Sequence, residues 1–380
     1  MNAAIVGVGE LTPVRYSEGK TTLSLISESV IAALQDAGLE KTDIDGLLVG
    51  PQVGETPQHV PATVSEYLGI EPVMSNTVDL GGASGPGMIW RAAAAIQMGM
   101  CETVVCVLAN KNEKGEVLKS PNRNPIREFD VPFGASGANT SYALLKRLHM
   151  EQYGSRQEDF AEIAYRAREN AQLNPKAIFH GKPNTVEEIL QSPMIADPLH
   201  LLEIVMPVAG GAAVIVTSEK KATTANHKPV FLKGAGEKIT HRAISQAPDT
   251  LPFSYSIPKA LQQANLKAED MDLLSLYDCY TSVVATQLES AGLCEPGKFG
   301  DFLRNYSFAP DGEYPLNTHG GQLGFGQADL AGGMSHVVEA VLQLRGEAEG
   351  RQIPEVTNAL VTGNGATLSE TNALILGGTP

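Results

Sequence analysis

The residue types that could do chemistry gather in four short segments, at 81–87, 276–280, 317–324 and 361–365. Each lies at or beside the end of a predicted strand, and open α/β folds build their sites at the carboxyl ends of strands. Glycine is concentrated around these segments, where it permits tight turns and lets a ligand approach the backbone. We therefore expect the four segments to converge on one pocket.

The segment at 81–87 reads Gly-Gly-Ala-Ser-Gly-Pro-Gly and stands between a strand that ends near Asp79 and a predicted helix. A strand, a tight turn and a helix collect backbone N–H groups at one spot, which suits an anion or a thioester oxygen. Gly82 is the candidate residue of this turn. Gly363, in Val-Thr-Gly-Asn-Gly at 361–365, offers a similar approach to the backbone. For the turn at 81–87, the alternative is a packing turn that needs only small residues.

Tyr277 and His319 are the candidate acid–base residues. Tyr277 lies in Leu-Tyr-Asp-Cys-Tyr at 276–280, and its alternative role is core packing with a satisfied hydroxyl. His319 precedes paired glycines, and histidine is the side chain best suited to proton transfer near neutral pH. Its alternative is a hydrogen-bonded structural role. Cys279 is expected to be a small buried residue, because nothing nearby in sequence would lower its pKa. The other seven histidines lack metal-ligand spacing, which predicts no metal site.

Length, composition and charge exclude several classes of protein. A chain of 380 residues is longer than a domain with a single hydrophobic core usually is. Hydrophobic residues make up 43% of the chain and charged residues 19%, and this composition excludes a disordered protein. With 28 basic and 43 acidic residues the formal charge is −15, which argues against duplex nucleic acid as a partner. The sequence has no apolar run long enough for a membrane span and no signal peptide pattern. Four scattered cysteines predict reduced thiols and a cytoplasmic protein.

Short β-rich runs alternate with amphipathic stretches, the pattern of an α/β protein. Strands are predicted at 3–8, 46–50, 73–78, 102–109, 212–218, 229–234, 273–279, 359–362 and 373–376. Helices are predicted at 21–37, 59–68, 84–100, 136–153, 157–173, 256–265, 281–293 and 331–345. Two halves of similar order suggest a duplicated fold, with domains at 1–225 and 226–380. The segment at about 111–202 breaks the alternation and is predicted to be an inserted loop domain.

These motifs, in this order, resemble the thiolase superfamily, specifically its sterol-carrier-protein-type thiolases and lipid-transfer-protein aldolases. The opening at 3–9 is similar to the family's first strand, and Gly-Ala-Ser-Gly at 82–85 stands in place of its Cys-x-Ser-Gly nucleophile turn. The segment at 277–280 resembles His-Asp-Cys-Phe. Gly-Gln-Ala at 326–328 stands where Gly-His-Pro is usual, and 363–365 where Gly-Gly-Gly follows a second cysteine. The resemblance covers essentially the whole chain and implies a thiolase fold with five layers, α-β-α-β-α.

The chain departs from the family at four catalytic positions. Gly82 replaces the nucleophilic cysteine and Val361 the second cysteine, while Tyr277 and Gln327 replace the two histidines. A thiolase needs a thiolate to take the acyl group, and glycine has no side chain that could be acylated. Ordinary thiolytic chemistry through a covalent intermediate at position 82 is therefore excluded.

The lipid-transfer-protein aldolases tolerate this loss, and the chain resembles them at 276–278, 317–324 and 343–346. The resemblance implies a thiolase-like acyl-CoA carbon–carbon lyase that cleaves a β-hydroxyacyl-CoA by a retro-aldol reaction. Tyr277 falls on the first of two tyrosines that these enzymes use, and the second has no counterpart at 325–329. Tyr277 is then the acid–base residue. Backbone N–H groups near Gly82 or Gly363, with His319, would stabilise the enolate oxygen, and Gln327 would help to bind the substrate.

Two other functions stay open at this point. The chain could be an atypical acyl-CoA thiolase or acetyltransferase that cleaves a β-ketoacyl-CoA with other residues. It could also be a non-catalytic thiolase-like subunit that binds acyl-CoA or acts as a scaffold, since four catalytic positions are altered.

The resemblance also implies a cofactor and partners. No cofactor is held permanently, and coenzyme A enters as part of the substrate. Lys111, Arg123 and Arg127, in a basic stretch at the start of the insertion, are the candidates for binding its phosphates, with a solvated loop as the alternative. Thiolases pair as homodimers, and the cysteine-less relatives commonly act with a small zinc-ribbon/OB-fold protein that helps to shape the acyl pocket.

Overall fold

The structure, a computed structural model, describes residues 3–51, 58–114, 129–135, 137–241 and 250–379. Within these ranges nine strands form one mixed sheet in the order β3-β2-β4-β7-β1-β8-β11-β10-β9. The strands are β1 (Ala3–Glu10), β2 (Gly46–Val49), β3 (Met74–Thr77), β4 (Thr103–Asn110), β7 (Gly210–Ser218), β8 (Val230–Ile239), β9 (Leu273–Ser275), β10 (Asn358–Gly365) and β11 (Glu370–Gly377).

The sheet divides into two halves that follow the sequence. β3-β2-β4-β7-β1 comes from the first part of the chain and β8-β11-β10-β9 from the second. They join where Ala4 and Ile5 of β1 pair with Phe231 and Val230 of β8. The expected boundary at 225/226 falls in the connection between α7 (Glu219–Ala222) and β8.

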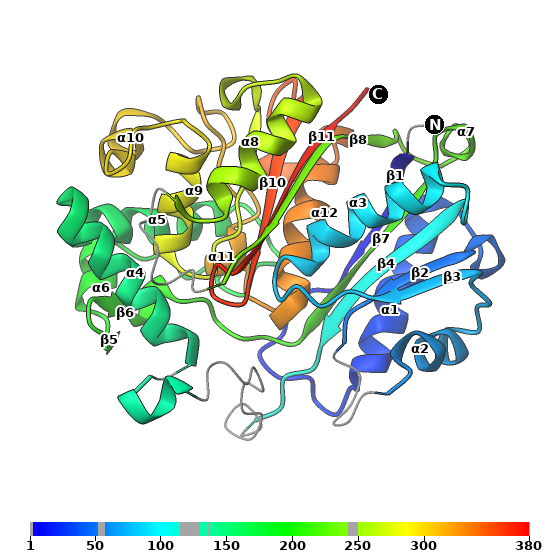
Figure 1. Ribbon diagram of the computed structural model, residues 1–380, viewed down its shortest axis with the longest axis horizontal. Helices are drawn as coiled ribbons and strands as arrows, with labels where there is room; N and C mark the ends of the chain where they lie inside the picture. Colours follow the sequence, from blue (N-terminus) through cyan, green and yellow to red (C-terminus); the bar gives the residue numbers. More distant parts are fainter. Residues whose placement is uncertain (1–2, 52–57, 115–128, 136, 242–249, 380) are drawn as a thin grey trace.

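Helices complete five layers (Figure 1). In the middle, α3 (Ser84–Gln97) and α12 (Gly332–Arg345) contact strands of both halves. On the outer side of the first half lie α1 (Thr22–Ala37) and α2 (Val60–Leu68), and on the outer side of the second half α8 (Phe253–Ala264) packs on β8 and β11. The predicted α-β-α-β-α arrangement is therefore present. Its buried strands fit their sequences: Val104–Leu108 of β4 are at most 2% exposed, as expected for a strand covered on both faces.

An inserted lobe follows β4 and lies beside the second half (Figure 1). It contains α4 (Gly137–Tyr153), α5 (Gln157–Ala171), α6 (Val186–Gln191) and a small hairpin of β5 (Met194–Ala196) and β6 (Leu199–His200). α4 and α5 both pack against α9 (Thr281–Ser290), so the lobe shares a hydrophobic core with the second half. Within the lobe, Lys146 donates to Glu203 at 2.6 Å with both side chains fully buried.

Two predicted elements differ in the structure. The strand predicted over 273–279 ends at Ser275, because the backbone of Leu276 forms its hydrogen bonds with the Asn317 side chain instead of a neighbouring strand. Asn317 Oδ1 accepts from Leu276 N at 2.7 Å, and Asn317 Nδ2 donates to Leu276 O at 2.8 Å. The glycine loop expected around 317–324 contains a short helix, α11 (Gly321–Phe325). Asp278 accepts hydrogen bonds from the N–H groups of Gln322 and Leu323 in its first turn, a cap supplied from a distant segment.

The short elements α6, α7, α10 (Phe299–Asn305), β5 and β6 were not predicted, because each is too brief to show a period in the sequence. No helix in the part of the chain described above combines the length and apolar character that a membrane crossing requires.

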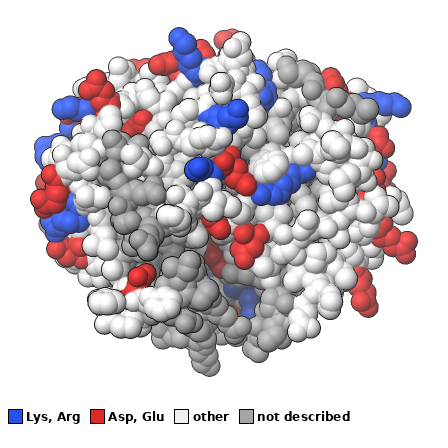
Figure 2. All heavy atoms as spheres, in the orientation of Figure 1, with Lys and Arg blue, Asp and Glu red and all other residues white. Residues whose placement is uncertain are grey.

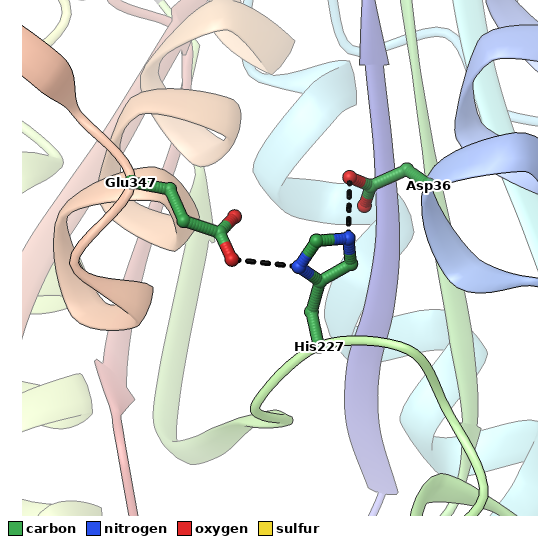
Figure 3. A group of neighbouring side chains, drawn as sticks. All are labelled: Asp36, His227 and Glu347. Carbon is green, nitrogen blue, oxygen red and sulfur yellow. Dashed lines mark hydrogen bonds and ion pairs between the residues drawn. The ribbon is translucent and has the colours of Figure 1, made fainter.

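A histidine links the two halves at the connection between α7 and β8 (Figure 3). His227 lies with Nδ1 at 2.6 Å from Glu347 Oε1 and with Nε2 at 3.4 Å from Asp36 Oδ1, and Arg345 also pairs with Asp36 at 2.8 Å. One metal ion can bind only one nitrogen of an imidazole ring, and here each nitrogen faces a different carboxylate. The group therefore has the geometry of an ion-pair link between α1 and the end of α12.

Candidate active site

The glycine-rich turns predicted to converge do meet in the structure. A Cβ added to Gly333, at the start of α12, would overlap the carbonyl oxygen of Gly82. A Cβ on Gly363 would lie 2.7 Å from Ala83 Cα, and one on Gly81 would lie 2.9 Å from Gly365 Cα. Only residues without side chains allow backbones to approach this closely. The turn before α3 is thus packed directly against β10 and α12.

The phenol of Tyr277 occupies the place that a side chain at position 82 would need. A Cβ built on Gly82 would overlap both the hydroxyl and the ring edge of Tyr277. Gln327 fixes the phenol from the other side, because its Nε2 donates to the Tyr277 hydroxyl oxygen at 2.9 Å. The backbone of Tyr277 is held as well, by the hydroxyl of Thr362 on β10 at 2.8 Å. Gly82, Tyr277, Gln327 and the strand that carries Gly363 therefore form one cluster.

Burial controls the ionisation of this phenol. Tyr277 is 2% exposed, and burial raises its pKa well above the usual value near 10. The negative charges of Asp329 and Asp278 raise the pKa further, and a hydrogen bond with Gln322 lowers it. The phenol is therefore protonated at neutral pH and can give a proton. The sequence left open whether Tyr277 acts as a base or mainly as an acid, and this environment favours the acid.

His319 lies deeper than Tyr277. It is 2% exposed, and neither ring nitrogen has a hydrogen-bond partner among the described residues. Burial lowers the pKa of the imidazole well below its usual value, and nearby His336 lowers it further. Its ring neighbours are Phe325 and His336, with centroids 5.7 and 5.1 Å away. A neutral imidazole with unused nitrogens can hydrogen-bond a water or a substrate oxygen.

His336 is a site residue that the sequence did not single out. It is fully buried on α12, and its ring centroid lies 6.0 Å from that of Tyr277. Its Nε2 lies 3.2 Å from Asp278 Oδ1, and its Nδ1 lies 3.1 Å from the Ser275 hydroxyl. His336 therefore joins His319 to the segment that carries Tyr277. The sequence offered no sign of this role, because a single histidine inside an apolar helix has the pattern of an ordinary buried core residue.

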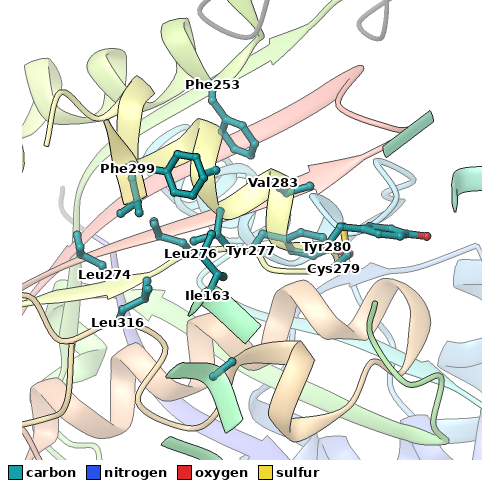
Figure 4. Packing of buried hydrophobic residues seen from close by; sticks show 14 of the residues in the cluster. Ile163, Phe253, Leu274, Leu276, Tyr277, Cys279, Tyr280, Val283, Phe299 and Leu316 are labelled. Atoms are coloured by element: carbon teal, nitrogen blue, oxygen red, sulfur yellow. The ribbon is translucent and has the colours of Figure 1, made fainter. Parts of the chain in front are cut away.

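A second buried tyrosine, Tyr142, lies near Cys279 and Tyr280, because Asn364 contacts both Tyr142 and Cys279. Figure 4 shows Tyr277, Cys279 and Tyr280 in the same buried cluster. Tyr142 of α4 stacks on Tyr280, with ring centroids 4.1 Å apart. Asn364 donates from Nδ2 to the Tyr142 hydroxyl at 2.7 Å and to Cys279 Sγ at 3.7 Å. Burial raises the pKa of the Cys279 thiol to about 12, so this sulfur is a protonated packing group rather than a nucleophile.

The predicted basic residues are only partly placed. Lys111 directly follows β4 and is half-buried, while Arg123 and Arg127 lie outside the described residues. On the face shown in Figure 2, basic and acidic side chains are intermixed. The three residues stay candidates for binding the phosphates of coenzyme A.

Comparisons with known proteins agree with this geometry. Residues 236–378 match a family model described as "Thiolase C-terminal domain-like". A steroid side-chain-cleaving aldolase of Thermomonospora curvata is 34% identical, over 99% of this chain and 97% of its own. The 17-hydroxy-3-oxo-4-pregnene-20-carboxyl-CoA lyase of Mycobacterium tuberculosis is 32% identical over 99% of each chain.

Solved structures show the same relationship. The structure titled Ltp2-ChsH2(DUF35) aldolase superposes with a TM-score of 0.90 at 33% identity and covers 99% of this chain and 97% of its own. An SCP2-thiolase-like protein of Mycobacterium smegmatis, with a TM-score of 0.75 at 23% identity over 100% of this chain and 77% of its own, shares the fold. Because relatives more than 30% identical align over nearly its whole length, the chain belongs to the thiolase superfamily, in the lipid-transfer-protein branch that includes the steroid side-chain-cleaving aldolase.

Proposed function

We propose that this chain is an acyl-CoA carbon–carbon lyase that cleaves a β-hydroxyacyl-CoA by a retro-aldol reaction, without a covalent acyl-enzyme. The observation that carries this proposal is the exchange at the centre of the site: the Tyr277 phenol fills the volume that a nucleophile at position 82 would need. An atypical thiolase would need another thiolate, and the nearest thiol, Cys279, is held protonated by burial.

The roles of the side chains follow from their ionisation. As the carbon–carbon bond breaks, negative charge develops on the thioester enolate, and the protonated Tyr277 supplies a proton to the enolate carbon. Gln327 holds the phenol in position through its 2.9 Å hydrogen bond. Neutral His319, with both nitrogens unused among the described residues, and backbone N–H groups near Gly82 and Gly363 donate to the enolate oxygen.

The substrate we propose is a CoA thioester with a β-hydroxyl on a bulky ring system. The lyase of Mycobacterium tuberculosis is named for a 17-hydroxy steroid with a 20-carboxyl-CoA side chain. Retro-aldol cleavage of that compound gives a 17-keto steroid and propionyl-CoA. Lys111, Arg123 and Arg127 bind the CoA phosphates in this proposal, so neutralising them should weaken binding and reduce its dependence on salt.

We also propose two protein partners. One is a small zinc-ribbon/OB-fold protein, since the matching solved structure is titled as an assembly with a DUF35 protein. The other is a second copy of this chain. β3 ends the sheet with Ser75 and Asn76 exposed, and a groove of about 610 Å³ lies between β3 and α3. Val73, just before β3, and Met98, just after α3, are 76% and 79% exposed. An edge strand with open backbone groups beside exposed apolar side chains favours pairing with another chain. The four unpaired cysteines fit a reducing cytoplasm.

A product assay tests the proposal. The chain, alone and with a DUF35 protein, is incubated with 17-hydroxy-3-oxo-4-pregnene-20-carboxyl-CoA, and the products are identified by mass spectrometry. We expect a 17-keto steroid and propionyl-CoA without any need for added CoA. In a parallel assay with a β-ketoacyl-CoA, cleavage that consumes free CoA would identify a thiolase instead, and binding of both thioesters without turnover would identify the scaffold function.

A further inference from the structure

A retro-aldol reaction needs a base as well as an acid, and the site as described so far lacks the base. The β-hydroxyl must lose its proton as the carbon–carbon bond breaks. Tyr277 cannot take that proton while its own hydroxyl is protonated, and burial keeps it so. This inference rests on the proposed function, because it asks which residue of the chain completes that reaction.

The buried groups around Tyr277 are unsuited to the task. Both oxygens of Asp278 accept hydrogen bonds from the backbone of α11, and Oδ1 also pairs with His336. Burial holds the thiol of Cys279 and the phenol of Tyr142 protonated, since it raises the pKa of both. Burial also disfavours protonation of His319, whose pKa lies well below its usual value.

The loop between α11 and α12 carries a different carboxylate, that of Asp329. Gln327 on this loop holds the Tyr277 hydroxyl, and its own backbone is fixed by hydrogen bonds with Met206 O at 2.9 Å and Val208 N at 3.0 Å. Six residues later, Gly333 packs against the carbonyl of Gly82. Both ends of this short loop therefore touch the centre of the site. Asp329 lies between them, two residues after the one that contacts the phenol.

The backbone at Asp329 turns its side chain away from the core. Its φ is +46°, a left-handed conformation that residues other than glycine adopt at a cost of about 1–2 kcal/mol. The flanking residues Ala328 and Leu330 are each 8% exposed and pack into the middle core, whereas Asp329 is exposed. Strained residues of this kind cluster at functional sites, and Asp329, unlike Glu355 at a similar φ, lies on a loop that contacts the candidate site.

The Asp329 carboxylate also acts electrostatically on the phenol, since its charge raises the pKa of Tyr277. This effect agrees with the position of Asp329 on the loop whose Gln327 holds the Tyr277 hydroxyl.

We propose that Asp329 is the general base of the reaction and takes the proton of the substrate's β-hydroxyl. In that step the O–H electrons form the new C=O bond, and the electrons of the Cα–Cβ bond pass to the thioester enolate. The Tyr277 phenol then protonates Cα, so the products are a ketone and a shortened acyl-CoA. Water returns the proton from Asp329 to the phenolate, and no oxidant or added reactant is consumed.

Chemical rescue tests this role. Glycine tolerates a φ of +46°, so Asp329→Gly removes the carboxylate without backbone strain and leaves space for a small anion. With 17-hydroxy-3-oxo-4-pregnene-20-carboxyl-CoA, we expect kcat to fall about 10²–10⁴-fold with little change in KM. Added formate should raise the kcat of Asp329→Gly at least about tenfold, and this gain should level off as the formate concentration increases. Asp329→Asn should be equally slow but resist rescue, because its amide fills the space.

Two controls separate the possible outcomes. Glu355 is an exposed carboxylate at a similar φ of +51°. Glu355→Gly should turn over the substrate at the rate of the unsubstituted chain, with or without formate. Tyr277→Phe should be slow and unaffected by formate. Full activity of Asp329→Gly, or a loss that formate does not reverse, would overturn the assignment. If the unmodified chain releases no propionyl-CoA, the proposed function fails, and this inference fails with it.

Discussion

Two buried phenols, those of Tyr277 and Tyr142, lie near Cys279, and they differ in what surrounds them. Tyr277 lies in space that Gly82 leaves empty, and Gln327 donates to its oxygen. Tyr142 belongs to α4 of the inserted lobe, stacks on Tyr280 and is held by Asn364, which also accepts from the N–H of Leu368. Burial raises the pKa of both phenols. A raised pKa therefore does not distinguish the phenol that we propose as the acid from the phenol that Asn364 holds; the two differ in the glycine turns packed around Tyr277.

The largest expected difference comes from removing the two hydroxyls in turn. Tyr277→Phe should lower kcat about 10²–10⁴-fold, because the proton donor is lost while the ring still fills its space. Steady-state kinetics on the steroid CoA thioester would measure this, with the half-exposed Tyr67→Phe as a matched control that keeps full activity. Near-normal turnover by Tyr277→Phe would remove this residue from the mechanism.

The next test adds a Cβ atom at position 82, in the space that the Tyr277 phenol fills. Gly82→Ala should displace the phenol and reduce kcat by about 10²-fold, the cost of misplacing a reacting group by roughly 1 Å. The added methyl should also lower the free energy of unfolding by about 1–3 kcal/mol.

A double-mutant cycle isolates this contact. In a Tyr277→Ala background the same Gly82→Ala change should cost much less stability, because the atoms it would overlap are gone. An equal loss of stability in both backgrounds, measured by urea unfolding, would show that the phenol does not occupy this space.

A smaller effect on activity is expected at the second phenol. Tyr142→Phe leaves the Asn364 amide with one hydrogen bond fewer in a buried site, which should cost about 1–3 kcal/mol of stability. Turnover should change less than about tenfold, because the hydroxyl is engaged by the structure rather than by the substrate. A loss of activity as large as that of Tyr277→Phe would erase the distinction between the two phenols.

The smallest effect concerns pH. Burial lowers the pKa of His319 below that of the unfolded chain, so between these two values the unfolded state binds more protons. The stability from neutral His319 is thus present above about pH 6.5 and lost as the pH falls, by up to ~1.4 kcal/mol per pH unit. His319→Gln should flatten the acid side of a plot of Tm against pH. An unchanged slope would show that His319 takes up its proton in the folded protein as easily as in the unfolded one.

Much of this fold could be predicted from the sequence, and part of the site could not. Long periodic elements such as α1 and α12 were predicted within a few residues, because burial of one face repeats along the chain. The motif positions of Gly82, Tyr277 and Gln327 predicted residues that lie together in the structure, and their roles stay a prediction.

Asp278, His336 and Asn317 act through contacts over long sequence separations, and no local pattern encodes those. The loss of strand after Ser275 has the same origin, since the Asn317 side chain comes from 41 residues away.

Intact-mass spectrometry during turnover tests the central claim most directly. The chain is mixed with the steroid CoA thioester and sampled while propionyl-CoA accumulates. We predict that the protein keeps its unmodified mass throughout, because glycine stands where a thioester would form and the phenol acts only as a proton donor. An adduct that carries the acyl group, formed and consumed at the rate of turnover, would contradict the account.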